Sequence, residues 1–176
     1  EADFSTSALC AAQPVWFSDQ SSSIETNPIM SWSWDFGNGN ISTESSPQHL
    51  YESTGPQDVE LRVTSLNGCT DTLQQTITVS PAPVAAIGDT NACAGQTFRL
   101  SDSSQVSSGS ITSWHWQIDS LTFDDPEPQL MLADTGNYNL TLSVESDAGC
   151  QDTRQGTLRV WPTPVADFTL PSDWGA

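Results

Sequence analysis

The sequence repeats itself with a period of about eighty residues, and this repeat limits the fold more than any other feature. The segment "WSWDF" at 32–36 recurs as "WHWQI" at 114–118. The segment "NGCTDT" at 67–72 recurs as "AGCQDT" at 148–153, with almost the same offset. A nearly constant offset of this kind indicates two copies of one folding unit rather than a single larger domain.

The opening segment of the unit occurs three times. It reads "EADFST" at 1–6, "PVAAIGD" at 83–89 and "PVADFTL" at 164–170. The joints between copies, "SPAPVAA" at 80–86 and "WPTPVAD" at 161–167, are rich in proline. Because proline disfavours a helical conformation in the residue before it, we expect short, stiff, extended connections.

We therefore predict one unit over residues 1–81, a second over 82–162, and the first strand of a further unit over 163–176. That strand either belongs to a longer tandem array or pairs with the sheet edge of another molecule. Glu1 already lies in a strand-like pattern without a signal peptide before it, so we expect a processed or excised piece. No apolar run approaches the roughly 20 residues that span a bilayer.

Within each unit, short alternating or aromatic-rich runs are separated by turn residues, and no stretch keeps a helical period over a useful length. The predicted strands are 15–19, 32–36, 59–65 and 73–80 in the first unit, and 97–102, 111–119, 138–146 and 156–161 in the second. Several short strands with regular turns indicate an all-β fold of two tandem two-sheet β-sandwiches.

The cysteines follow the same repeat. The spacing from Cys10 to Cys69 is nearly the same as the spacing from Cys93 to Cys150. Each unit has one cysteine before its second strand and one at the turn before its last strand. We therefore predict one disulfide within each unit, Cys10–Cys69 and Cys93–Cys150, and hence an oxidising compartment. A zinc site would need four ligands with short C-x-x-C spacing, which neither unit offers.

The aromatic strands predict where the cores lie, because side chains two residues apart share one face of a strand. The two sets that share a face are Trp32, Trp34 and Phe36 in the first unit, and Trp114, Trp116 and Ile118 in the second. We expect both sets to face the sandwich core. Asp35 lies beside the turn "GNGN", where an aspartate usually accepts backbone N–H groups.

The stretch from Trp32 to Cys69 resembles the signature of the PKD domain, the polycystic-kidney-disease-type immunoglobulin-like module. That family is recognised by W-D-F-G-D-G, then H-x-Y, then G-x-Y-x-V-x-L-x-V. The matching residues are Trp34, Asp35, Phe36, Gly37, Asn38, Gly39, His49, Tyr51, Gly55, Val59, Leu61 and Val63. The resemblance covers nearly all of residues 1–80 and implies an immunoglobulin-like sandwich. The cysteine pair and the "ADF" opening resemble a bacterial subgroup found in tandem on large secreted surface proteins, including those of gliding, type IX-secreting bacteria.

The second unit keeps the frame of this family but loses the motif. It retains Trp116, Gly136, Tyr138, Leu140, Leu142 and Val144. Gln117 stands where the first unit has Asp35, and the H-x-Y segment is absent. A function that depended on Asp35 would not transfer to the second unit, so we interpret the motif as architectural.

Neither unit offers a recognisable catalytic arrangement. His49 fills the H-x-Y position, which the resemblance makes structural, and His115 lies between two core-facing tryptophans and so faces outward. The cysteines are expected to be paired, which leaves no thiol nucleophile. No P-loop, dinucleotide fingerprint, HExxH or nucleophile elbow is present. We therefore predict a protein that is not an enzyme and requires no cofactor.

Calcium is the one metal that the sequence suggests. The loop "FDDPEP" at 123–128 gathers Asp124, Asp125 and Glu127, and calcium takes six to eight oxygen ligands from loops of this kind. Some PKD-like modules bind calcium near their domain joints. The alternatives are a site at Asp35 with Asn38, or a solvated acidic loop that binds nothing.

Four residues are candidate glycosylation sites. Asn40 and Asn139 lie in N-x-S/T sequons. The segments "DTL" at 71–73 and "DSL" at 119–121 resemble the sites on which gliding-type bacteria O-glycosylate exported proteins, which implies sugars on Thr72 and Ser120. Motifs this short also arise by chance.

The charge restricts the partners. There are 22 acidic residues against four arginines and no lysine, so the formal net charge is −18. Such a surface repels phosphate backbones, which argues against nucleic-acid binding. Of the seven tryptophans, Trp161 and Trp174 are the surface candidates, the facing of Trp16 is open, and two scattered aromatics do not make a sugar-binding cleft.

These features together predict an extracellular structural spacer, a repeat of a bacterial surface adhesin or filament. Its partners would be neighbouring repeats or subunits of the same polymer, with surface polysaccharide as a further candidate. The alternative is an accessory module of a secreted enzyme that binds polysaccharide or protein. A fold alone does not decide between these functions.

Overall fold

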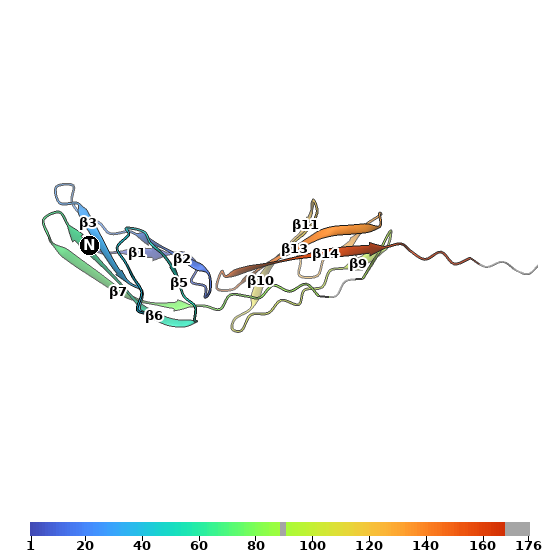
Figure 1. Cartoon of the computed structure of the whole chain (residues 1–176), viewed down its shortest axis with the longest axis horizontal. Helices are drawn as coiled ribbons and strands as arrows, with labels where there is room; N and C mark the ends of the chain where they lie inside the picture. The colour runs from blue at the N-terminus through green and yellow to red at the C-terminus, as the bar shows by residue number, and fades with distance from the viewer. Residues whose placement is uncertain (89–90, 168–176) are drawn as a thin grey trace, which may run out of the picture.

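The computed structural model describes residues 1–88 and 91–167, and it consists of two β-sandwiches arranged end to end (Figure 1). Every regular element in the described residues is a β-strand. In this part of the chain there is no helix of the length and hydropathy needed to cross a membrane. The all-β fold is therefore confirmed, with the two units forming a long, narrow molecule (Figure 1).

The first unit packs a four-stranded sheet of order β4-β3-β6-β7 against a three-stranded sheet of order β1-β2-β5. All neighbours in these sheets are antiparallel. The strands are β1 (Phe4–Thr6), β2 (Pro14–Asp19), β3 (Ile29–Asp35), β4 (Ile41–Ser42), β5 (Gln48–Leu50), β6 (Gly55–Ser65) and β7 (Thr70–Val79).

The second unit repeats this plan with a five-stranded sheet of order β11-β10-β13-β14-β8 and a two-stranded sheet of order β12-β9. The pair β14–β8 is parallel and the other pairs are antiparallel. The strands are β8 (Ala92–Cys93), β9 (Thr97–Arg99), β10 (Ile111–Ile118), β11 (Leu121–Phe123), β12 (Gln129–Met131), β13 (Gly136–Ser146) and β14 (Gln151–Trp161).

The two units also share strand register. Trp34 on β3 lies opposite Leu61 on β6, and Trp116 on β10 lies opposite Leu142 on β13. Both strand pairs carry a register shift near their start, at Ile29/Ser31 and at Ile111/Ser113. Because bulges are built into a fold rather than scattered at random, a bulge at the same place in both units supports their common origin.

The alternation along β3 and β10 sets the two cores, as the sequence predicted. Trp34 and Trp116 are both fully buried, and Phe36 and Ile118 are buried beside them. Trp32 and Trp114 are half-buried and pack on the edges of the same cores. Their indole N–H groups donate to carboxylates at equivalent places, Asp19 and Asp102, each at 2.7 Å.

The opening segment of the second unit differs from the prediction. Residues 83–88 form no strand, and their ladder pairing is limited to two isolated bridges, Val84 with Gln105 and Ile87 with Asp102. In the first unit the equivalent segment does form a strand, β1, which pairs with β2. Residues 163–167 also form no strand, and the rest of the predicted third opening, with Trp174, lies outside the described residues.

The predicted disulfides are wrong. The structure contains one disulfide, Cys10–Cys150, which joins the two units with a Cα–Cα distance of 5.6 Å, while Cys69 and Cys93 carry no disulfide. The physical reason is the length of β7. Cys10 forms an isolated β-bridge with Ser80, the residue just after this strand, whereas Cys69 immediately precedes the strand. A strand of this length separates the two ends by roughly 30 Å, whereas a disulfide needs Cα atoms within about 7 Å.

The cysteines of the second unit are separated in the same way. Cys93 lies opposite Trp161 at the end of β14, and Cys150 immediately precedes the start of that strand. The two cysteines of each unit therefore lie at opposite ends of their sandwich, where they can reach a neighbouring unit but not each other.

We expect a non-reducing protease digest of the purified chain to contain one cross-linked peptide pair, joining the Cys10 peptide to the Cys150 peptide. Mass spectrometry before and after reduction identifies the pair. A digest in which Cys10 is linked to Cys69, or Cys93 to Cys150, would contradict the structure.

Candidate functional site

The joint between the two units is the most distinctive local structure in the chain. The Cys10–Cys150 disulfide connects the loop before β2 to the turn between β13 and β14, and both cysteines are buried. Beside it, Gln13 Nε2 donates a hydrogen bond to the carbonyl of Gln151. A Cβ built on Gly149 would lie 3.8 Å from the Ala8 methyl group, so the two units are in van der Waals contact here.

The connecting segment that runs beside the joint is tied at both ends. Ser80 exchanges backbone hydrogen bonds with Leu9 and Ala11, which belong to the first unit. On the other side, Ala85 N donates to Asp152 Oδ2 at 2.8 Å, which fixes the segment to the second unit. Only residues 81–84, which include Pro81 and Pro83, lie between the two anchored residues Ser80 and Ala85.

An aspartate holds the start of each unit in place. Ala2 N donates to Asp71 Oδ2 at 2.7 Å, just as Ala85 N donates to Asp152. The donated hydrogen bond from Ala2 lowers the pKa of Asp71, since it favours the ionised carboxylate. Both aspartates lie in the repeated segments "GCTDT" and "GCQDT". The repeat alone did not indicate that they accept a backbone hydrogen bond from the start of each unit.

The Trp-Asp-Phe-Gly motif forms a tight turn at the end of β3. Asp35 Oδ1 accepts a hydrogen bond from Gly37 N at 2.9 Å, which is the role expected of an aspartate before such a turn. Gly37 adopts a φ of +77°, and a Cβ on this residue would lie 2.6 Å from the carbonyl oxygen of Asp58. The turn therefore needs glycine for both backbone conformation and space.

The His-x-Tyr residues complete this turn from β5 and the segment that follows it. The His49 ring stacks on Phe36 with 4.2 Å between centroids, and Tyr51 packs edge-on against His49. Tyr51 Oη donates to the Phe36 carbonyl at 3.1 Å, and Asn38 Nδ2 lies 2.9 Å from His49 Nε2. The polar atoms of the motif are thus engaged in holding the turn, which matches the architectural interpretation.

Burial changes the acid–base behaviour of this cluster. It lowers the pKa of His49, because the stacked ring is poorly solvated and its charged form is disfavoured. Burial, followed by the nearby Asp35 carboxylate, raises the pKa of Tyr51 to about 12. Both shifts favour the neutral forms of the two side chains.

The second unit has lost part of this arrangement. In the first unit Trp34 Nε1 donates to the Glu44 carbonyl at 2.9 Å, whereas Trp116 Nε1 is buried without a hydrogen-bond partner in the described residues. Gln117 uses its side-chain amide to bond the Asp119 carbonyl within the β10–β11 turn. The unit keeps its fold through its core while its motif has degenerated.

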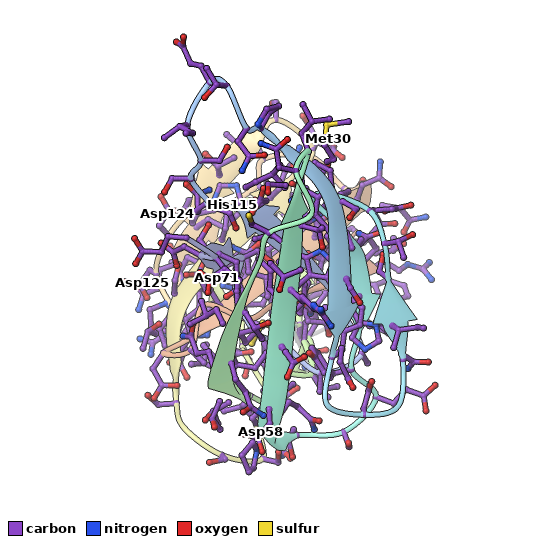
Figure 2. The ribbon with its side chains drawn as sticks, turned by 90° about the vertical axis from the view of Figure 1, so that its left-hand side faces the viewer. Met30, Asp58, Asp71, His115, Asp124 and Asp125 are labelled. Carbon is purple, nitrogen blue, oxygen red and sulfur yellow. A yellow bond between two sulfur atoms is a disulfide. The ribbon has the colours of Figure 1, made fainter. Side chains whose placement is uncertain are left out.

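The structure does not gather the predicted calcium ligands. Figure 2 shows Asp124 and Asp125 at the outer edge of the molecule. Asp124 bonds His115 at 2.6 Å, Asp125 accepts from its own loop, and Glu127 pairs with Arg99 at 3.0 Å. No group of three or more potential ligands that could hold a metal ion occurs among residues 1–88 and 91–167.

The alternative pair, Asp35 and Asn38, is also engaged locally. Asp35 Oδ1 accepts from Gly37 N, and Asn38 Oδ1 accepts from Asn40 N at 3.3 Å. Calcium binding therefore stays a prediction that rests on composition.

The candidate glycosylation residues all lie on the surface. Asn40, Thr72, Ser120 and Asn139 are exposed. Asn40 and Ser120 lie in turns or loops, whereas Thr72 and Asn139 lie within β7 and β13 and face solvent from the sheet. Each side chain is accessible, and modification stays a prediction.

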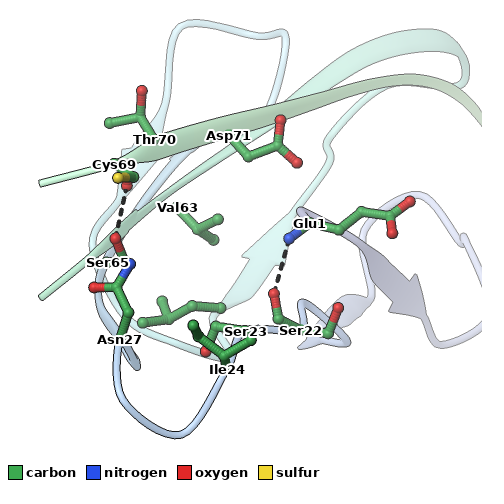
Figure 3. Close-up of a pocket in the computed structure, with 11 residues that line it drawn as sticks. Glu1, Ser22, Ser23, Ile24, Asn27, Val63, Ser65, Cys69, Thr70 and Asp71 are labelled. Atoms are coloured by element: carbon green, nitrogen blue, oxygen red, sulfur yellow. Dashed lines mark hydrogen bonds between the residues drawn. The ribbon is translucent and has the colours of Figure 1, made fainter. Parts of the chain in front are cut away.

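The exposed tryptophans among residues 1–88 and 91–167 do not form a binding platform. Trp16 and Trp161 are 57% and 47% exposed, and Trp161 is covered on one face by the Arg159 guanidinium, 3.6 Å from the ring centroid. A hollow of about 190 Å³ opens beside the β6–β7 turn at the outer end of the first unit (Figure 3). Glu1, Cys69 and Asp71 contribute to its walls, and none of its lining residues is aromatic.

Two glycines of the motif turn allow a matched test. Gly39 also has positive φ, +87°, but a Cβ there meets nothing within 4 Å. We expect Gly39→Ala to cost about 1–2 kcal/mol from backbone strain, and Gly37→Ala to cost about 1–3 kcal/mol more from the contact with Asp58. Urea denaturation measures both values. Equal losses for the two variants would contradict the steric role of Gly37.

The raised pKa of Tyr51 predicts a loss of stability in alkali. Below the ordinary tyrosine pKa of about 10, the phenol is neutral in both states. Between about 10 and the folded value of about 12, the unfolded chain gives up the proton and the folded chain does not, so the free energy of unfolding falls as pH rises. Urea denaturation across this window should show a shallower fall for Tyr51→Phe than for the native chain. Equal slopes would contradict the prediction.

Comparison with known proteins places these features in a family. The profile of the PKD domain matches the chain twice, over residues 1–81 and 79–160. Pre-pro-metalloprotease PrtV of Vibrio cholerae serotype O1 (strain M66-2) is 35% identical over 102 residues, which are 57% of this chain and 11% of that protein. Collagenase ColA of Clostridium perfringens (strain 13 / Type A) is 28% identical over 148 residues, which are 82% of this chain and 13% of that protein.

A solved structure agrees on the fold. The fibronectin(III)-like modules of Clostridium thermocellum CbhA superpose with a TM-score of 0.53 at 12% identity, covering 97% of this chain and 100% of theirs. The segments that match this chain make up only 11% and 13% of the length of the two relatives named above. From the two profile matches and the two repeated sandwiches, the chain belongs to the PKD domain family and comprises two tandem PKD domains.

Proposed function

We propose that this chain is a non-catalytic accessory module of a secreted enzyme, in which it acts as a stiff spacer between neighbouring parts. The observation that carries the proposal is the Cys10–Cys150 disulfide, which joins the two PKD domains covalently. A pair of domains connected only by a linker would rotate relative to each other by default. A second covalent connection restricts that rotation.

The other contacts of the joint also restrict rotation between the two domains. The connection is anchored at Ser80 and Ala85, and the Gln13–Gln151 hydrogen bond lies beside the disulfide. The domains lie end to end, so a fixed joint keeps the outer ends of the module far apart (Figure 1). Separation at fixed orientation is the property that a spacer needs.

The chemistry of the chain supports a non-catalytic role. PKD domains are non-catalytic modules, and both histidines of this chain have structural surroundings. His49 stacks on Phe36 and packs edge-on against Tyr51, and His115 is an exposed residue on β10 that pairs with Asp124. Neither contacts a serine or cysteine nucleophile among the hydrogen bonds of the described residues.

The relatives support a secreted enzyme as the parent protein. A metalloprotease and a collagenase each contain a matching segment that is a small fraction of their length. A disulfide between domains suits the same extracellular setting, because it forms and persists in oxidising compartments. We therefore infer an extracellular location for the chain, as part of a larger protein.

The second candidate is a repeat of a bacterial surface adhesin or filament, of the kind exported by gliding bacteria. The observation in its favour is the third opening segment, "PVADF" at 164–168, which continues the repeat beyond the two domains. The two candidates differ in their neighbours. Peptides of a catalytic domain in the native protein would support the enzyme, and a long series of further repeat peptides would support the adhesin.

A spacer should not retain the substrate of its parent protein. We expect the purified chain to remain in the supernatant when it is mixed with insoluble collagen or with insoluble polysaccharides and centrifuged. A complete collagen-binding protein serves as the positive control. Saturable retention on either material would replace the spacer with a substrate-binding role.

The stiffness of the joint can be measured by small-angle X-ray scattering. We expect the double variant Cys10→Ser/Cys150→Ser to show a broader range of overall dimensions than the native chain, because the domains then pivot on the linker. The matched control, Cys69→Ser/Cys93→Ser, changes the same number of cysteines and should leave the scattering unchanged. Identical scattering from all three proteins would show that the disulfide is not needed for stiffness.

A further inference from the structure

Cys69 and Cys93 occupy the same positions in their domains as the two cysteines of the joint. Cys93 is the counterpart of Cys10. Ala11 N donates to the Ser80 carbonyl at 2.9 Å after Cys10, and Ala94 N donates to the Trp161 carbonyl at 2.8 Å after Cys93. Each cysteine therefore lies in the same backbone arrangement, beside the end of the last strand of its domain.

Cys69 is likewise the counterpart of Cys150. Ser65 N donates to the Cys69 carbonyl at 2.9 Å, and Ser146 N donates to the Cys150 carbonyl at 2.8 Å. The glycine before each cysteine has nearly the same positive φ, +80° at Gly68 and +74° at Gly149. The two turns thus hold their cysteines in the same backbone arrangement.

The residues that accompany the disulfide also recur. The joint donor Gln13 lies in "CAAQ", and the same place in the second domain is Gln96 in "CAGQ". Its acceptor in the joint is the carbonyl that follows Cys150, and the matching carbonyl in the first domain belongs to Thr70. A second set of joint contacts is therefore present, divided between the two outer ends of the molecule.

Exposure distinguishes the two sets. Cys10 and Cys150 are 2% and 0% exposed, whereas Cys69 is exposed and Cys93 is only partly buried. Gln96 is exposed where Gln13 is half-buried. Cysteine is among the residues most often buried, so an exposed cysteine is unusual. An unpaired thiol in a secreted protein indicates that it forms a disulfide with another molecule or domain. Each outer end of the molecule therefore carries the residues of one side of such a joint, without the matching residues of a second domain.

We propose that Cys69 and Cys93 form disulfides with adjacent PKD domains, so that domains are linked head to tail by repeated copies of the Cys10–Cys150 joint. Cys93 bonds the cysteine at the β6–β7 type turn of the following domain, and Cys69 bonds the cysteine before the second strand of the preceding domain. Gln96 donates to the carbonyl after the partner cysteine. The inference goes beyond the spacer role and holds for either parent protein.

The bond forms by thiol–disulfide exchange with a small-molecule disulfide such as oxidised glutathione. The thiolate of one protein cysteine attacks the small disulfide and releases one small thiolate, which leaves a mixed disulfide. The second protein thiolate then displaces the other small thiolate. The two protein thiols lose two protons and two electrons in all, and the small disulfide is reduced to two thiols.

The repeat itself provides a test at the natural spacing. A single-chain dimer is made by following residue 165 of one copy with Ala2 of a second copy, because the sequence after Val165 aligns with the sequence that starts at Ala2. In this protein the separation between Cys93 of the first copy and Cys69 of the second copy is 140, the same as between Cys10 and Cys150.

We expect the single-chain dimer, oxidised with glutathione, to yield a cross-linked peptide pair of Cys93 from the first copy and Cys69 from the second. One thiol of each copy should then be lost to alkylation. The control is the same dimer with Cys93→Ser in the first copy, in which the second copy's Cys69 should stay alkylatable. A dimer that keeps both thiols, or that links Cys93 to Cys93, overturns the proposal.

A second experiment asks whether separate chains also join. Cys69→Ser and Cys93→Ser variants of the chain each keep one of the two thiols, and they are oxidised alone and as a mixture at moderate salt, which screens the repulsion between acidic chains. Disulfide-linked heterodimers in the mixture would extend the proposal to separate molecules. Their absence, with the single-chain dimer linked, would confine the joint to domains of one polypeptide. Efficient homodimers of either variant alone would contradict head-to-tail pairing.

Discussion

The Cys10–Cys150 disulfide is the constraint on which the organisation of the molecule depends. Each sandwich has its own core and its own turn geometry, and neither needs the other for its internal hydrogen bonds. The two domains are joined covalently by the disulfide at their junction, beside the anchored connection and the Gln13–Gln151 contact. The strands hold each cysteine at the end of its sandwich, so the pairing follows from strand length.

Most of the fold could be predicted from the sequence, whereas the predicted pairing of the cysteines was wrong. Alternation around Trp34 and Trp116 was enough to locate both cores, because a fully buried indole on a short strand fixes which face points inward. The cysteine spacings were equally consistent with pairing within or between units. A signal was nevertheless present. A cysteine in the turn before a long last strand cannot reach a cysteine beside the end of that strand, because the length of the strand alone keeps them too far apart.

Local chemistry was harder to predict than the fold. The role of Asp35 followed from turn chemistry, whereas the paired roles of Asp71 and Asp152 depend on which backbone N–H groups the fold brings near them. The acidic loop at 123–128 resembled a ligand cluster in sequence, but its side chains turn to separate partners. These contacts agree with a PKD pair whose polar motif residues stabilise the turns and the starts of the domains.

If the disulfide makes a stiff joint, the two domains tumble together as one rigid body, and residual dipolar couplings of the partially aligned chain measure this. Backbone N–H couplings are measured separately for β-strand residues of each domain in the oxidised protein. A stiff joint gives both domains one alignment tensor, of the same magnitude and orientation, in the frame of this structure. Two tensors of clearly different magnitude would show independent motion, and the disulfide would then be a tether rather than a rigid joint.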